Sequence, residues 1–173
     1  MLMRALPPFS ALSLVLLVPL IAAWQAAPGV SAPGLDADTL VATIDGQSYE
    51  AGFAVAVRRC VIPSRCTIVV RTKAKATFGE DAPPTTELRL TLSQVEDEPA
   101  TYDLTRLSRA RVSVPNGAGA PTIYAAERDG GRGTVEVTAI SEAGFKGTFA
   151  FTAVAEDGST ITVTDGTFSL EFV

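Results

Sequence analysis

The chain's two cysteines, Cys60 and Cys66, are separated by Val-Ile-Pro-Ser-Arg. Two cysteines this close predict a disulfide in an oxidising compartment, and a loop this small stabilises the fold by about 2 kcal/mol. A redox pair favours the shorter Cys-x-x-Cys spacing. A metal site would need further ligands, which no histidine or additional cysteine supplies. We therefore expect a structural disulfide, no metal site and no cofactor.

Catalytic side chains are scarce. The chain has no histidine, which excludes Ser-His-Asp and Cys-His arrangements, and it has neither a Gly-x-Ser-x-Gly nor a Ser-x-x-Lys motif. Glu136 and Glu171 are the remaining candidates, as the carboxylate pair of a glycosidase. Each lies in a strand pattern on the side opposite the apolar residues, which predicts the solvent face. We expect no catalytic residues and no enzyme activity.

Basic side chains gather in one segment of this acidic chain, whose net charge is −5. No acid occurs between Glu50 and Glu80, and an extended strand would point side chains two residues apart to one side. The segment predicts a surface for an anionic partner, such as lipid headgroups, acidic polysaccharide or another protein. The competing interpretation is that lysines protect an edge strand from aggregation. The basic residues are Arg58, Arg59, Arg65, Arg71, Lys73 and Lys75.

The elements that position these residues are predicted to be strands. Apolar residues recur with a period of two, as in Leu88, Leu90 and Leu92, with polar residues between them. This pattern is typical of antiparallel sheets with one wet face. We expect an all-β fold, either an antiparallel β-sandwich or a small β-barrel of about 8–10 short strands.

The predicted strands are short and regularly spaced. The turn Asp45-Gly46 separates the first two, and residues 106–120 show no clear element. Near the end, Asp165-Gly166 separates 161–163 from 168–172. The other predicted strands are 40–44, 48–57, 67–77, 87–93, 101–105, 122–127, 134–140 and 147–154.

Four phenylalanines lie on the apolar faces of the last strands: Phe149, Phe151, Phe168 and Phe172. They are predicted to form the core. Alternatively, they would line a barrel interior that holds an apolar ligand.

The N-terminal residues resemble a secretory signal. Arg4 is the only charged residue before Asp36, and the apolar run of 9–23 is followed by small residues. We predict a signal peptide at 1–27, a flexible linker at 28–38 and a single all-β domain at 39–173; an uncleaved anchor is the alternative. The mature chain is expected to be exported (periplasmic, cell-surface or secreted), not integral to the membrane, and not to bind nucleic acid.

Four short motifs carry a resemblance to a known group: Ala42-Thr-Ile-Asp-Gly46, Gly133-Thr-Val-Glu-Val137, Gly147-Thr-Phe-Ala-Phe-Thr-Ala153 and Asp165-Gly-Thr-Phe168. Together they resemble a group of exported bacterial all-β domains of unknown function. The resemblance implies an envelope or secreted domain and brings no catalytic residues. Members often look like lipoproteins, but this chain lacks the N-terminal cysteine.

The sequence therefore predicts an exported bacterial domain that acts in non-catalytic binding or structural interaction. Its partner is not identified by the sequence, although an anionic envelope component or a protein fits the basic segment. The alternative is a carrier of a small apolar ligand within a barrel interior.

Overall fold

The computed structural model describes residues 38–62, 65–74, 85–117 and 119–173. Its secondary structure there is all strand, which confirms the predicted all-β class. None of the described residues forms a helix that could cross a membrane. The predicted signal peptide, the linker up to residue 37 and Lys75 lie outside the described residues.

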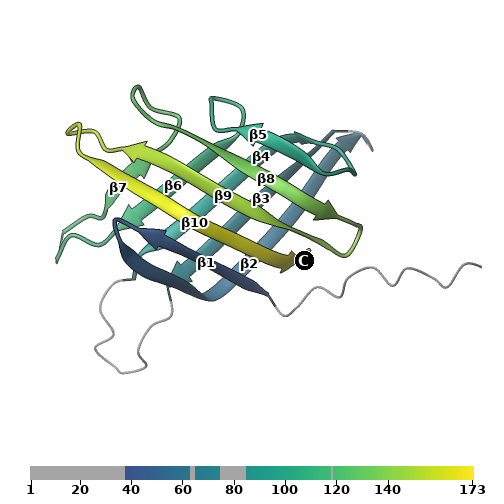
Figure 1. The fold of residues 1–173 in the computed structure, drawn as a ribbon, viewed down its shortest axis with the longest axis horizontal. Coiled ribbons are helices and arrows are strands. Elements are labelled where there is room, and N and C mark those ends of the chain that lie inside the picture. The colour runs from purple at the N-terminus through teal and green to yellow at the C-terminus, as the bar shows by residue number, and fades with distance from the viewer. Residues whose placement is uncertain (1–37, 63–64, 75–84, 118) are drawn as a thin grey trace, which may run out of the picture. The chain divides into compact units, whose positions relative to one another are not determined.

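Ten strands are present in the described part of the chain (Figure 1). They are β1 (Thr39–Ile44), β2 (Gln47–Ile62), β3 (Arg65–Ala74), β4 (Glu87–Val95), β5 (Ala100–Asp103), β6 (Arg109–Val114), β7 (Thr122–Ala125), β8 (Arg132–Ile140), β9 (Gly144–Val154) and β10 (Thr160–Glu171).

Eight of these strands close into an antiparallel barrel. The hydrogen-bonded order runs β10-β1-β2-β3-β4-β6-β7-β9, and β9 pairs again with β10. β8 pairs with β9, and β5 pairs with β8, as an extension of the same sheet (Figure 1). The predicted small barrel is therefore confirmed and the sandwich is wrong. The physical reason is that β10 pairs with β9 along one edge and with β1 along the other, so the sheet closes on itself.

Asp165-Gly166 is a β-bulge inside β10, and the strand does not end there. Asp165 has a φ of 52°, and the pairing of β10 with β9 shifts between Val163 and Gly166. The extra residue reverses the alternation of side chains. As a result Val163 before the bulge and Phe168 after it both face the interior, although one number is odd and the other even.

β6 was not predicted from the sequence. Its Ala110 and Val112 are fully buried, while Arg109 and Arg111 are exposed. Two small apolar residues between arginines give a weak strand signal, since the inward positions carry little apolar surface. Pairing with β4 along five residues, from Thr91↔Arg109 to Glu87↔Ser113, fixes this segment as a strand.

Side chains fill the barrel. The ring centroid of Phe149 lies 6.2 Å from that of Phe151 and 6.3 Å from that of Phe168, and all three residues are buried. Phe172 stacks on Phe145 at one end, with 5.2 Å between ring centroids. The backbone N–H of Val173 donates to the carbonyl of Ala56, so the C-terminal residues cross from β10 to β2 at that end.

The packing around Gly147 leads to a stability prediction. A Cβ at this position would lie 2.8 Å from Cζ of Phe168 and would clash with the backbone carbonyl of Glu136 on β8. We expect Gly147→Ala to lower the free energy of unfolding by about 1–3 kcal/mol, because backbone and a buried ring must move. Urea denaturation measures this, with Thr148→Ala, at the next and exposed position, as the control. An unchanged midpoint for Gly147→Ala would contradict the close approach.

Candidate anion-binding face

Three arginines lie directly opposite one another on the outside of the barrel. Arg71 on β3 pairs with Arg89 on β4, and Arg89 pairs with Arg111 on β6. All three are exposed. Neighbouring strands are ~4.8 Å apart, so this arginine row extends roughly 10 Å across the strands.

Further cations extend the row on both sides. Arg59 shares a shallow depression with Arg71, Arg89 and the half-buried Val57 and Val69. Leu107 lies among the cations on the β6 side. We call the whole set the basic wall: Arg59, Arg65, Arg71, Lys73, Arg89, Arg106, Arg109 and Arg111.

Acidic partners in the described residues balance only part of this charge. Lys73 pairs with Glu87 at 3.2 Å, and Nε of Arg111 donates to Oε1 of Glu127 at 2.7 Å. Arg71 and Arg89 form no ion pair with any carboxylate that the structure describes. Like charges directly opposite on neighbouring strands destabilise a sheet by roughly 0.2–1 kcal/mol per pair. A bound anion would relieve this repulsion.

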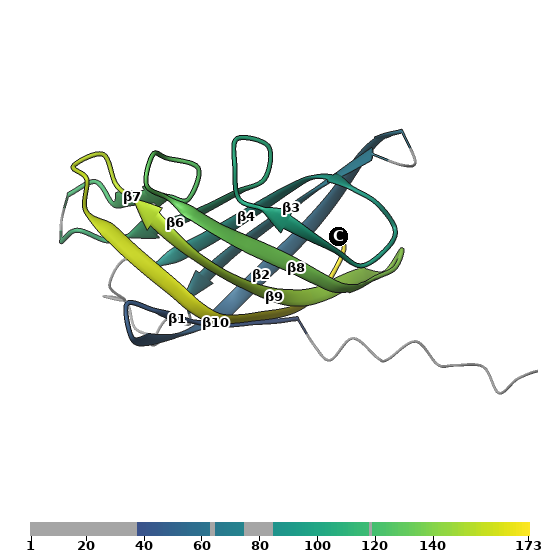
Figure 2. The same ribbon diagram turned by 45° about the horizontal axis from the view of Figure 1, so that its top comes forward.

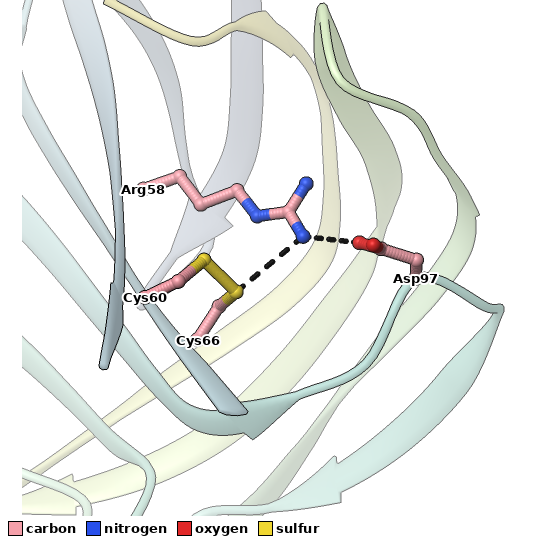
Figure 3. Close-up of a disulfide and its surroundings, with 4 residues drawn as sticks. All are labelled: Arg58, Cys60, Cys66 and Asp97. Atoms are coloured by element: carbon pink, nitrogen blue, oxygen red, sulfur yellow. Dashed lines mark hydrogen bonds and ion pairs between the residues drawn. A yellow bond between two sulfur atoms is a disulfide. The ribbon is translucent and has the colours of Figure 1, made fainter. Parts of the chain in front are cut away.

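Arg58 does not belong to this face, contrary to its inclusion in the predicted basic set. Consecutive strand residues point to opposite sides, so Arg59 faces outward while Arg58 follows Ala56 toward the interior. Figure 3 shows its guanidinium between the disulfide and Asp97, where Nη2 donates to Sγ of Cys66 at 3.4 Å and forms an ion pair with Asp97. Its Cζ also lies 5.8 Å from the centroid of the Phe172 ring.

The predicted disulfide is confirmed. Cys60 and Cys66 are paired residues of β2 and β3, with Cα atoms 4.0 Å apart. The bond links the two strands just before the tip of their hairpin. Of the predicted basic residues, Arg59, Arg65, Arg71 and Lys73 lie on the basic wall, and Lys75 lies outside the described residues.

Four residues of the basic wall were not predicted from the sequence: Arg89, Arg106, Arg109 and Arg111. Arg89 lies between the inward Leu88 and Leu90, so alternation alone would have placed it outside. Only the register of β3, β4 and β6 brings it opposite Arg71 and Arg111. These three residues are far apart in the sequence, and the basic segment of 58–75 contains only one of them, Arg71.

The two candidate catalytic carboxylates are not brought together. Glu136 and Glu171 are both exposed. Glu136 is level with Thr148 on β9 and, through it, with Thr167 on β10, four residues before Glu171. That offset amounts to ~13 Å along the strand, beyond the roughly 5–9.5 Å between the carboxylates of glycosidases. Among the described residues, no group of three His, Cys, Asp or Glu side chains could hold a metal ion.

The four predicted phenylalanines belong to the packed interior. Phe149, Phe151 and Phe168 are buried in the core, and Phe172 packs against it. A pocket of about 530 Å³ does open among the strands at the β1–β2 hairpin, lined in part by Ile44, Tyr124 and Ile161. None of the four phenylalanines lines it.

Tyr49 forms a buried polar chain beside this pocket. Its hydroxyl lies 2.6 Å from Oγ1 of Thr72, which donates to the carbonyl of Leu88 at 3.1 Å, so Tyr49 is the donor to Thr72. Burial raises the pKa of Tyr49, because it disfavours the charged phenolate. Burial likewise raises the pKa of Tyr102.

Comparison with known families gives one match. Residues 81–170 match the family model described as a domain of unknown function (DUF6252). The matched region includes the motifs at Gly133, Gly147 and Asp165 and excludes the one at Ala42. No curated protein and no solved structure matches the chain significantly.

The raised pKa of Tyr49 predicts how stability depends on alkaline pH. The folded state keeps the phenol neutral, so this contribution is fully present below the unfolded pKa of about 10 and is lost as the pH rises through the folded pKa. We expect Tyr49→Phe to cost about 1 kcal/mol near neutral pH, through the lost hydrogen bond, and to flatten the decline of stability above pH ~10. Urea titrations across this range measure both, and parallel declines would contradict the assignment.

Proposed function

The chain belongs to the DUF6252 family, and from that premise we propose that it is a non-catalytic binding domain of an exported bacterial protein. In this proposal the basic wall holds an anionic partner. The disulfide supports export, because such bonds persist in oxidising compartments. The family match is consistent with the resemblance to exported all-β domains.

The observation that carries the proposal is the arginine row. Three exposed guanidinium groups face outward from adjacent strands, and two of them form no ion pair with a described carboxylate. An anion at this row would gain charge-assisted hydrogen bonds from several arginines at once. A partner with repeated charges would use the row along its whole length.

The topology removes the competing interpretation of the basic segment. Lysines and arginines protect edge strands, which present unpaired backbone groups. β3 lies between β2 and β4, and β4 lies between β3 and β6, so neither is an edge strand. The cations on them therefore have no edge to protect.

The distribution of charge also favours an anionic partner. The net charge is −5, yet β3, β4 and β6 carry one acid, Glu87, against Arg65, Arg71, Lys73, Arg89, Arg109 and Arg111. A cationic surface on an acidic protein orients an approaching anion toward that surface. Binding of this kind weakens as salt increases, because exposed charges are screened within about 10 Å at 0.1 M ionic strength.

Neither of the other functional hypotheses has comparable support. The separation of Glu136 and Glu171 along the sheet argues against a carboxylate-pair mechanism. A carrier would need an apolar cavity, whereas the lining of the pocket at the β1–β2 hairpin includes Asp45, Gln47 and Glu50. Phe149, Phe151 and Phe168 are buried against one another. We therefore assign no substrate and no apolar cargo.

Arg89→Thr tests the proposal, with dextran sulfate as a linear polyanion. We expect the affinity to fall about tenfold, or ~1.4 kcal/mol, because the central cation of the row is lost. Stability should stay equal or rise slightly, since the repulsion from Arg71 and Arg111 disappears. Calorimetry at low and high salt measures binding, and urea denaturation measures stability.

Arg132→Thr is the matched control. Arg132 is exposed on β8, outside the basic wall, and the substitution changes charge and side chain in the same way. Its affinity for dextran sulfate should stay close to that of the wild type. Equal losses in the two variants, or no binding by the wild type, would refute the role of the basic wall.

A further inference from the structure

The tip of the β2–β3 hairpin exposes large apolar side chains. Val61 is 94% exposed and Ile62 is 49% exposed. The hairpin extends past the neighbouring strand ends in both views (Figures 1 and 2). Both side chains are far more exposed than the apolar residues of the core, so the tip contributes little to the burial that stabilises the barrel.

The disulfide restrains this tip. Cys60 immediately precedes Val61, and its bond to Cys66 joins the strands on either side of the exposed residues. Apolar side chains on a cross-linked hairpin lose less conformational freedom on binding than they would on a free loop. The cross-link therefore lowers the entropic cost of burying Val61 and Ile62 against a partner.

Two cations flank the tip, and a third exposed apolar residue lies farther along the basic wall. Arg59 and Arg65 flank it in sequence, and both are exposed. Arg59 is level with Thr67 on β3 and Ser93 on β4, and Oγ of Ser93 donates to the carbonyl of Leu107 at 2.8 Å. Leu107 is 61% exposed. The basic wall thus carries exposed apolar side chains beside its cations, at Val61 and Ile62 next to Arg59 and at Leu107 next to Arg106.

We propose that the partner of the basic wall is the surface of an anionic lipid bilayer, with Val61 and Ile62 inserted among the headgroups. This inference rests on the proposed function and names its partner. Peripheral lipid binding combines apolar side chains at the headgroup boundary with cations that attract anionic lipids. A soluble polyanion would engage the arginines but would give the apolar tip no place to be buried.

Acidic residues near the tip repel anionic headgroups and so weaken the attraction between the basic wall and the bilayer. Glu96, Asp97 and Glu98 follow β4, whose Val95 is level with Cys66. Asp97 is paired with Arg58, and Glu96 and Glu98 are exposed. Glu96→Gln with Glu98→Gln should therefore strengthen binding to anionic vesicles, since two repulsive charges are removed.

The decisive experiment measures sedimentation of the predicted mature chain, residues 28–173, with vesicles, in parallel with binding to dextran sulfate. Vesicles of phosphatidylcholine with phosphatidylglycerol should bind the wild type, and vesicles of phosphatidylcholine alone should not. Val61→Ser with Ile62→Ser, which adds no charge beside Arg59 and Arg65, should weaken vesicle binding by at least about tenfold and leave dextran sulfate binding unchanged. Val41→Ser, at an exposed apolar position on β1, is the matched control and should change neither.

The two measurements separate the two proposals. Binding of dextran sulfate without binding to anionic vesicles would overturn the bilayer inference and leave the basic wall intact. Vesicle binding that is unaffected by the tip substitutions would do the same. Vesicle binding that depends on the tip but not on Arg89 would instead overturn the role of the arginine row. Circular dichroism of each variant checks folding.

Discussion

Closure of the barrel by β10 is the constraint on which the rest of the structure depends. β10 pairs with β9 along one side and with β1 along the other, so the first and last strands of the domain become neighbours. The bulge at Asp165 keeps Val163 and Phe168 on the inner face. With the ring closed, every strand of the barrel has a buried face and a solvent face, and inside and outside positions alternate along it.

This alternation explains why neighbouring residues have different roles. Arg58 and Arg59 are adjacent in the sequence but lie in different surroundings. Arg58 points inward and contacts Asp97 and Phe172, whereas Arg59 lies on the basic wall. The same alternation places Leu88 and Leu90 in the core and Arg89 between them on the surface. The interior supplies the stability, which leaves the outer positions free to carry repulsive charge.

The basic wall and the apolar hairpin tip are best understood together. Each is costly alone, since aligned arginines repel one another and exposed valine and isoleucine side chains order water. The two features meet on β2, where Arg59 of the basic wall precedes Cys60 and the exposed Val61 follows it, and the disulfide from Cys60 fixes this part of β2 to β3. A bilayer with anionic headgroups would pair with the arginines and bury the apolar side chains of the tip. The two observations therefore favour a single partner.

The sequence by itself determined the all-β class, most of the strands and the disulfide. The period of two in Leu88–Leu92 and Phe149–Phe151 depends on local alternation, and the cysteines are close in the chain, so each of these features is visible without long-range pairing. The choice of a barrel over a sandwich, the inward direction of Arg58 and the continuity of β10 through Asp165-Gly166 were decided by the tertiary structure. The alignment of Arg71, Arg89 and Arg111 was decided there too. It depends on the register of three strands, and register is set by which residues pair across the sheet.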